Sequence, residues 1–265
     1  QKNYVMKNFV SDVAKTNKIN LAGSVHIQVD SALADPVSET SWLSKYMPSE
    51  IPSAIVGFVD LAKENAEDVI KRHLTYPKFR GVRQIIGKLE KRPDLSFTNE
   101  NLLLNKCWQK NFALLEKHNL SFDLQLYPEQ MSEYAEFLSD FPRIPVVVDH
   151  AGCPYDQSDS GLSIWKKSLS SLAALPNLHI KLSGFGMYDK NWSSESTQII
   201  FDSILENFTP NRIMWGSNFP VERLVRSYSF CVNQLLKWLN PLSTKEKNSI
   251  ASETALKYYH IGKKF

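Results

Sequence analysis

The feature that most constrains the fold is a repeated alternation of short β-branched runs with amphipathic helical segments. In segments such as residues 105–119 and 129–141, apolar side chains recur at i, i+3 and i+4, the helix period. Successive runs start roughly 25 to 40 residues apart, the size of a βα unit. This order predicts a parallel sheet covered by helices. The predicted strands are Ser24–Asp30, Ala54–Leu61, Phe79–Ile86, Ser121–Pro128, Ile144–Gly152, Leu178–Gly186 and Arg212–Phe219.

The length of the chain is compatible with one large barrel or with two ordinary domains. No repeat, low-complexity tract or long linker divides the 265 residues, and neither G-x-G-x-x-G nor a Walker lysine loop is present. We therefore predict an α/β fold, a (β/α)8 TIM barrel forming a single domain over residues 1–265, with the first strand missing. Because the first twenty residues look helical and the sequence starts with Gln1, we expect the missing strand upstream and the domain to be N-terminally incomplete.

Composition narrows the classes of function. The net charge is +3, and no run of five basic residues exists, which argues against a nucleic-acid surface. No apolar stretch approaches the ~20 residues that span a bilayer, so we expect no membrane partner. Cys107, Cys153 and Cys231 form no CxxC pair, and no signal-peptide pattern is present, which indicates a cytoplasmic location. A homo-oligomer stays open.

In a TIM barrel, the working side chains lie at the C-terminal ends of the strands, and alternation decides which of them face the axis. In "VVVDHAG", His150 shares a face with Val146 and Val148, and Asp149 points the other way. Because histidine is a common acid, base and metal ligand, we expect His150 to be catalytic. The alternative is a hydrogen-bonded histidine in the barrel wall.

An arginine forms the second candidate. In "FRGVRQ", Arg80 and Arg83 lie on opposite faces. Arg83 is nearer the strand end and could clamp a carboxylate or a lactone oxygen with two hydrogen bonds. The alternative is an ion pair with a helix.

Two other strands carry polar residues on one predicted inward face. These residues are His26, Gln28 and Asp30 in "VHIQVD", and Asp123, Gln125 and Tyr127 in "FDLQLY". Tyr127 is nearest the strand end and could donate a hydrogen bond to an oxyanion. The alternative is that these polar layers fill the barrel structurally.

Two further side chains have a reactive and a structural interpretation. Lys181, which shares a face with Ser183, could be a base or a Schiff-base nucleophile, but a paired lysine is commoner. Cys153 could form a nucleophile pair with His150, but a small buried residue in a tight loop is the simpler interpretation.

Together these motifs resemble the amidohydrolase-related TIM-barrel hydrolases, in the branch of sugar-acid lactonases and 2-pyrone-4,6-dicarboxylate hydrolase. The motifs, in order, are "VHIQVDSALADPVSETSWL", "IVGFVDL", "FRGVRQI", "FDLQL", "VVVDHAGCP", "IKLSGFG" and "MWGSNFPVE". The resemblance implies that activated water hydrolyses a cyclic ester or a related bond in a small anionic or sugar-derived substrate. His150 matches the family's later histidine, Arg83 matches an arginine that contacts the anionic group, and Gln28 matches without an assigned role.

The resemblance also implies a cofactor, one divalent zinc or manganese ion, although a member of the branch works without metal. His150 would be a metal ligand only if an upstream His-x-His completed the site. Asn218 stands where the resemblance puts an aspartate, and an amide cannot accept a proton and is a poor zinc ligand. We expect Asn218 to orient water or substrate at the catalytic end of the strand. The alternatives are a binding barrel that has lost turnover and a metal-dependent decarboxylase.

Overall fold

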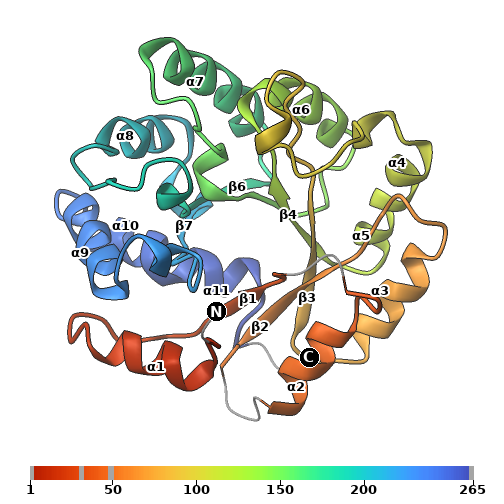
Figure 1. The fold of residues 1–265 in the computed structure, drawn as a ribbon, viewed down its shortest axis with the longest axis horizontal. Coiled ribbons are helices and arrows are strands. Elements are labelled where there is room, and N and C mark those ends of the chain that lie inside the picture. The colour runs from red at the N-terminus through yellow and green to blue at the C-terminus, as the bar shows by residue number, and fades with distance from the viewer. Residues whose placement is uncertain (1–2, 30–32, 47–50, 263–265) are drawn as a thin grey trace.

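The fold is a parallel sheet curled around an apolar and polar interior (Figure 1). The computed structural model describes residues 3–29, 33–46 and 51–262. Over these residues the sheet has seven strands, hydrogen-bonded in chain order and parallel throughout. They are β1 (Val25–Ile27), β2 (Ala54–Phe58), β3 (Phe79–Ile85), β4 (Ser121–Gln125), β5 (Val146–Val148), β6 (Leu178–Leu182) and β7 (Ile213–Trp215).

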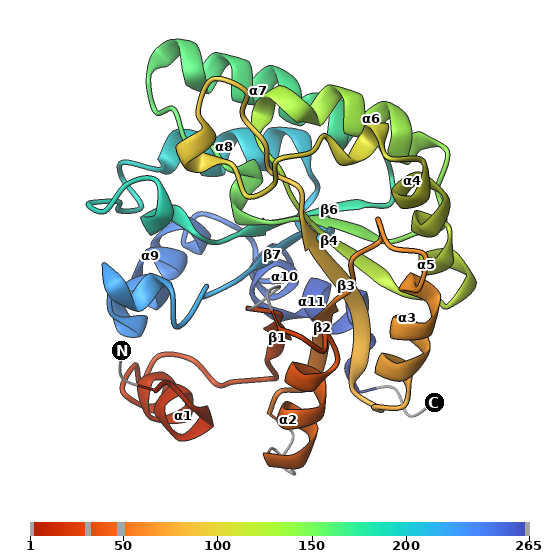
Figure 2. The same cartoon turned by 45° about the vertical axis from the view of Figure 1, so that its right-hand side comes forward.

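Helices alternate with the strands, and most of them cover the outer face of the sheet (Figures 1 and 2). They are α1 (Met6–Ala14), α2 (Ser38–Tyr46), α3 (Ala66–Leu74), α4 (Lys106–Phe112), α5 (Leu114–Lys117), α6 (Met131–Ser139), α7 (Asp159–Ala173), α8 (Gln198–Asn207), α9 (Tyr228–Leu239), α10 (Thr244–Asn248) and α11 (Thr254–Tyr258). Helix α1 lies beside α9, where Phe9 and Val13 pack against Tyr228 and Val232 (Figure 2).

The predicted α/β barrel is confirmed, including the missing strand. A closed barrel of this class has eight strands, and the described sheet has seven, with β1 and β7 as its edges. Each predicted strand is found, although several are shorter because their last residues belong to loops. A single domain over residues 1–265 stays a prediction.

Helix α7 shows how the outer layer forms. The Ser158 hydroxyl caps its first turn by accepting a hydrogen bond from Gly161 N at 3.1 Å. Trp165, Leu169 and Leu172 recur at the helix period and are fully buried. They belong to the same apolar cluster as Val146 and Val148 of β5, so these two valines face the helices.

The opposite face of the sheet lines the interior. Ala54, Val147 and Met214 come from three different strands but form one apolar cluster there. The C-terminal end of the chain completes this cluster with Tyr258 and Tyr259, which are buried to 7% and 1% exposure. Helix α11 therefore packs inside the curl of the sheet and contacts side chains from both edge strands.

Tyr259 also ends in a polar contact. Its hydroxyl group lies 3.2 and 3.0 Å from the two carboxylate oxygens of Asp123 on β4. A buried carboxylate needs such donors, because burial without them costs several kcal/mol. The hydroxyl of Tyr134 on α6 is buried too, but it forms no hydrogen bond with the described residues.

These two tyrosines form a matched pair for mutation. We expect Tyr259→Phe to lower the free energy of unfolding by about 1.5 to 3 kcal/mol, since the lost hydrogen bond goes to a charged group. Tyr134→Phe should cost nothing or stabilise slightly, because no hydrogen bond is lost. Urea unfolding followed by tryptophan fluorescence measures both. Equal losses in the two variants would contradict the role of Tyr259.

Candidate active site

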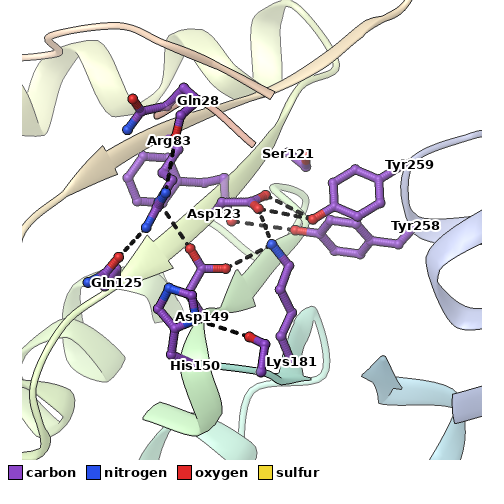
Figure 3. A network of polar contacts seen from close by, with 12 residues as sticks. Gln28, Arg83, Ser121, Asp123, Gln125, Asp149, His150, Lys181, Tyr258 and Tyr259 are labelled. Atoms are coloured by element: carbon purple, nitrogen blue, oxygen red, sulfur yellow. Dashed lines mark hydrogen bonds and ion pairs between the residues drawn. The ribbon is translucent and has the colours of Figure 1, made fainter. Parts of the chain in front are cut away.

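Four charged side chains from neighbouring strands meet in the barrel interior: Arg83, Asp123, Asp149 and Lys181 (Figure 3). Lys181 Nζ lies 2.8 Å from Asp149 Oδ1 and also pairs with Asp123. Arg83 Nε lies 3.1 Å from Asp149 Oδ2. The side chains are 12%, 0%, 3% and 9% exposed, respectively. Two cations and two carboxylates thus balance with little help from water.

Strand register brings this charge network together. Arg83 of β3 is the partner of Asp123 on β4, and Asp123 is the partner of Val147 on β5, two residues before Asp149. Side chains two residues apart on a strand share a face. Asp149 and Val147 therefore both point inward, and Asp149 reaches Arg83 and Lys181.

The network shifts the acidities of its members. Burial raises the pKa of Asp123 to about 6, although the charge of Lys181 acts in the opposite direction. Burial also works to raise the pKa of Asp149, but Lys181 and Arg83 outweigh it and hold that pKa below its ordinary value. For Lys181, the two carboxylates overcome burial and raise its pKa. Asp149 and Lys181 are consequently held in their charged forms near neutral pH.

His150 lies where the chain leaves β5. His150 and Ala151 both have φ of +54° and Cys153 has φ of +52°, a left-handed turn that costs non-glycine residues ~1 kcal/mol or more each. Nδ1 of His150 lies 3.0 Å from the Ser183 hydroxyl. A Cβ on Gly184 would come within 2.5 Å of that nitrogen, so the ring packs directly on a glycine backbone.

The surroundings of His150 determine its protonation state. Burial lowers its pKa to about 4, an effect that Asp149 opposes and that Arg83 and Lys181 strengthen. The imidazole is therefore neutral at pH 7. Nε2 forms no hydrogen bond within the described part of the chain, so it is the nitrogen left for a ligand or a proton.

Asn218 follows β7 in a left-handed turn with φ of +52°. Asparagine tolerates this conformation better than most residues. Its backbone carbonyl accepts a hydrogen bond from Glu222 N at 2.9 Å, which closes the turn. The residue thus lies at the C-terminal end of a strand, as expected.

The structure brings several predicted residues together. Arg83 donates hydrogen bonds to the Gln28 carbonyl oxygen at 3.1 Å and to the side chain of Gln125. Arg83 also forms an ion pair with Asp149, and Lys181 links Asp149 to Asp123. Arg80 instead donates to the carbonyl oxygens of residues 77 and 79. Asp30 lies outside the described residues.

Tyr127 lies apart from this cluster. Its hydroxyl group donates to the Leu95 carbonyl at 2.6 Å, and its ring packs near Leu89 and Cys153. The hydroxyl is therefore already committed within the loop that follows β3. Its predicted contact with a substrate stays untested.

Two predicted strand faces are wrong. On β1 the side chains of Val25 and Ile27 pack against the interior cluster, whereas His26 Nε2 lies 2.7 Å from Glu39 Oε1 on α2. The Glu39 carboxylate thus gives the His26 ring a polar partner on the outer face. On β5 the error came from extending the alternation to His150, where the backbone is no longer extended.

The sequence argument also missed Asp149, Ser183 and Glu222 as site residues. Asp149 lies two residues after the inward Val147, so a correct strand phase would have identified it. For Lys181, the paired state that we considered commoner is the one observed. Cys153 is 1% exposed in the tight loop after β5, in line with the simpler structural interpretation, and burial raises the pKa of its thiol to about 12.

A metal centre does not form from the described residues alone. They contain no group of three or more His, Cys, Asp or Glu side chains placed to hold an ion. Asp123 and Asp149 are engaged by cations, which leaves His150 as a single good ligand. On their own, these residues do not fit a zinc site, which needs at least three protein ligands.

Comparison with known proteins agrees with this geometry. Residues 42–261, most of the chain, match the amidohydrolase family. The chain belongs to the amidohydrolase family. The predicted family is thereby confirmed.

Relatives of this amidohydrolase include the uncharacterized protein y4mH of Sinorhizobium fredii, 32% identical over 98% of this chain and 86% of that protein. An L-fucono-1,5-lactonase of Burkholderia multivorans is 29% identical over 79% of this chain and 72% of its own length. A crystal structure of a Burkholderia multivorans amidohydrolase with bound zinc has a TM-score of 0.83 at 23% identity, covering 98% and 89% of the two chains. A Pseudomonas putida structure, provisionally assigned as a 2-pyrone-4,6-dicarboxylic acid hydrolase, has a TM-score of 0.76 at 14% identity, covering 100% and 90%.

The charge network of this amidohydrolase gives a direct test. We expect Lys181→Met to lower the free energy of unfolding by about 3 to 5 kcal/mol, because two buried carboxylates then share one cation. Lys237→Met is the matched control, since Lys237 also pairs with a carboxylate, Glu195, at 2.7 Å but on the surface. It should leave stability unchanged. Denaturant midpoints that fall by the same amount in both variants would refute a special role for the buried network.

Proposed function

We propose that this amidohydrolase hydrolyses the lactone of a small anionic or sugar-derived acid at the C-terminal ends of its strands. The observation that carries the proposal is the neutral His150, whose free Nε2 lies beside a buried and charge-balanced network. The L-fucono-1,5-lactonase among the relatives supports a lactone as the substrate class.

Arg83 is the proposed anchor for the substrate. A guanidinium has five N–H donors, of which one on Nη1 binds Gln28 and one on Nη2 binds Gln125, while Nε lies in ion-pair distance of Asp149. The remaining donors can bind a carboxylate or a lactone carbonyl oxygen. Because Asp149 already balances one positive charge, Arg83 is held in place before substrate arrives.

Asp123, fully buried and paired with Lys181, supports Arg83 through Asp149 in this proposal. Gln28 contributes its backbone carbonyl to the same arginine. Contacts of substrate with the side chains of Gln28, Asp30, Asp123 and Tyr127 stay predictions.

His150 is the proposed proton acceptor. If Nδ1–H donates to the Ser183 hydroxyl, Nε2 keeps a lone pair that can accept a proton from attacking water. A base with a pKa of about 4 is weak, which favours an activated acyl group such as a lactone over an amide. Asn218 then orients the water or the substrate through its amide.

A metal would enter at His150. Nε2 is the atom that would hold a zinc or manganese ion, and the further ligands would have to come from outside the described residues. The zinc-bound relative shows that the fold accommodates such an ion in that protein. When bound, the ion would supply Lewis-acid activation of water.

Location and assembly remain proposals. Three free cysteines fit a cytoplasmic enzyme. No helix in the described parts of the chain reaches the length and apolarity that a bilayer crossing requires. The proposed partner is a small-molecule substrate, and a homo-oligomer stays open.

A screen of sugar-acid lactones with His150→Ala tests the proposal. We expect kcat/KM to fall by about 10²- to 10⁴-fold, the usual contribution of a positioned proton acceptor. His118→Ala is the control, because His118 pairs with Glu67 on the helix layer and should leave the rate unchanged. If His150→Ala keeps wild-type activity, His150 is not catalytic. If no lactone is hydrolysed but lactones still bind, the barrel is a binding protein without turnover.

The pH dependence of hydrolysis gives a second test. A protonated imidazole cannot accept a proton, and burial lowers the pKa of His150 from 6.5 to about 4. Activity should therefore be lost as pH falls through about 4, rather than near 6.5. Values of kcat/KM from initial rates between roughly pH 3.5 and 8, a range that includes the ordinary and the lowered pKa of histidine, measure this. Circular dichroism verifies that the protein stays folded. An acid limb near pH 6.5 would argue against His150 as the acceptor.

A further inference from the structure

Glu222 is a buried carboxylate that the charge network does not use. It lies in the turn after β7 and is 3% exposed. Its Oε1 accepts hydrogen bonds from Gly186 N at 3.1 Å and from the Trp192 indole. Glu222 therefore joins the loop after β6 to the turn that carries Asn218.

The second carboxylate oxygen of Glu222, Oε2, is buried in the same turn as the Asn218 amide nitrogen. Burial raises the pKa of Glu222, and donors from Trp192, Gly186 and the Asn218 side chain oppose that rise. Oε2 of Glu222, an acceptor, and Nδ2 of Asn218, a donor, are both buried, and neither has a hydrogen-bond partner in the described ranges. The backbone bond from Glu222 N to Asn218 O fixes the two residues in one turn.

The burial of Nδ2 indicates the orientation of the amide. Asn218 is only partly buried as a residue, whereas its Nδ2 is fully buried. With Nδ2 directed to Glu222, Oδ1 is the polar atom that stays accessible. An accessible oxygen accepts hydrogen bonds and cannot donate them.

No cation among the described residues forms an ion pair with Glu222, and Arg226 donates to the Trp192 carbonyl instead. The carboxylate is thus stabilised by N–H donors. An aspartate at position 218 would replace one donor with a second negative charge, and adjacent buried carboxylates cannot both ionise without cost.

Glu222 is too enclosed to reach a substrate. The cavity that it borders, with Ser183 and Ser217, has a volume of about 10 Å³. Sites for small ligands are usually some hundreds of Å³. Any effect of Glu222 on the reaction must therefore act through another residue.

We propose that Glu222 is a positioning residue that holds the Asn218 amide with Nδ2 toward its carboxylate and Oδ1 toward the strand-end face, and that this pairing makes asparagine, not aspartate, the residue matched to position 218. The orientation rests on the burial of Nδ2 and Oε2 and on the backbone bond that closes the turn. Its consequence for water or substrate rests on the proposed lactone hydrolysis.

A double-mutant cycle tests the pairing. Asn218→Asp places a second carboxylate next to that of Glu222. Glu222→Gln places two amide groups together, while the side-chain oxygen of the introduced glutamine can still accept hydrogen bonds from Gly186 and Trp192. Each single variant should unfold more easily than wild type. The double variant Asn218→Asp/Glu222→Gln restores one donor and one acceptor with the roles exchanged, so its equilibrium constant for folding should exceed the additive expectation by about 10-fold or more.

Additive effects would overturn the proposal. If either single variant fails to fold, the double variant decides, because the pairing predicts that it folds and a mere packing role predicts that it does not. Glu195→Gln makes the same chemical change at a surface carboxylate paired with Lys237 and should change nothing.

A spectroscopic measurement tests the orientation without any activity assay. In protein with ¹⁵N-labelled asparagine, the Asn218 side-chain amide, assigned by its absence in Asn218→Asp, should exchange slowly with solvent in the wild type. Glu222→Gln should shift its resonances and speed exchange by about 10-fold or more, because the donor then turns outward. Glu195→Gln should leave them unchanged. An Asn218 amide that is insensitive to Glu222→Gln would refute the proposal, even if lactone hydrolysis is observed.

Activity separates the two proposals. If no lactone is hydrolysed but the coupling and the amide shifts are found, the pairing stands and the proposed function fails. Where the wild type is active, Glu222→Gln should lower kcat more than it raises KM. The Asn218 amide would then turn its N–H donors, in place of its oxygen acceptor, toward the strand-end face. Loss of kcat without any change in the amide signals would contradict a positioning role.

Discussion

Four charges lie inside the barrel with almost no contact with water, and the arrangement of the strands has to keep them paired. Moving one ion from water into a protein interior costs several kcal/mol, and only close partners offset this cost. Arg83, Asp149, Lys181 and Asp123 meet that requirement as a chain in which cations and carboxylates alternate. Tyr259 extends the chain with a hydroxyl from the C-terminal end of the protein. The network thus joins β3 through β6 to the segment that fills the interior.

The same network prepares the candidate site. Arg83 is held by Asp149, Gln125 and the Gln28 carbonyl, so its free donors have fixed directions before a substrate binds. Preorganised donors of this kind avoid a cost of reorganisation during the reaction. The nearby positive charges also help burial keep His150 neutral. One cluster of ion pairs thereby determines both where an anion could bind and in which form the histidine is present.

Strand order and the inward position of Asp123 and Gln125 could be predicted from the sequence, because β-branched runs and alternation report directly on buried strands. The family followed from the resemblance of the ordered motifs. The inward faces of β1 and β5 could not be predicted from the sequence. His26 is polar but lies on the outer face, because its ring binds the carboxylate of Glu39 on α2. The local alternation of side chains does not predict a partner thirteen residues away. His150 was counted as part of a strand that had already turned into a left-handed loop. Both errors arise where a polar side chain meets a partner from another element, which is a tertiary fact.

The exchange of aspartate for asparagine at position 218 looks different once its surroundings are included. Considered alone, the amide has lost a proton acceptor and a metal ligand. Beside the buried Glu222, however, a second carboxylate would be the costly choice, and an amide supplies the donor that this site lacks. The turn then still contains a carboxylate, that of Glu222, which lies four residues further along the chain and is buried. In the proposed orientation the end of the strand presents a neutral hydrogen-bond acceptor, which suits the orientation of water or an ester more than the binding of a dication.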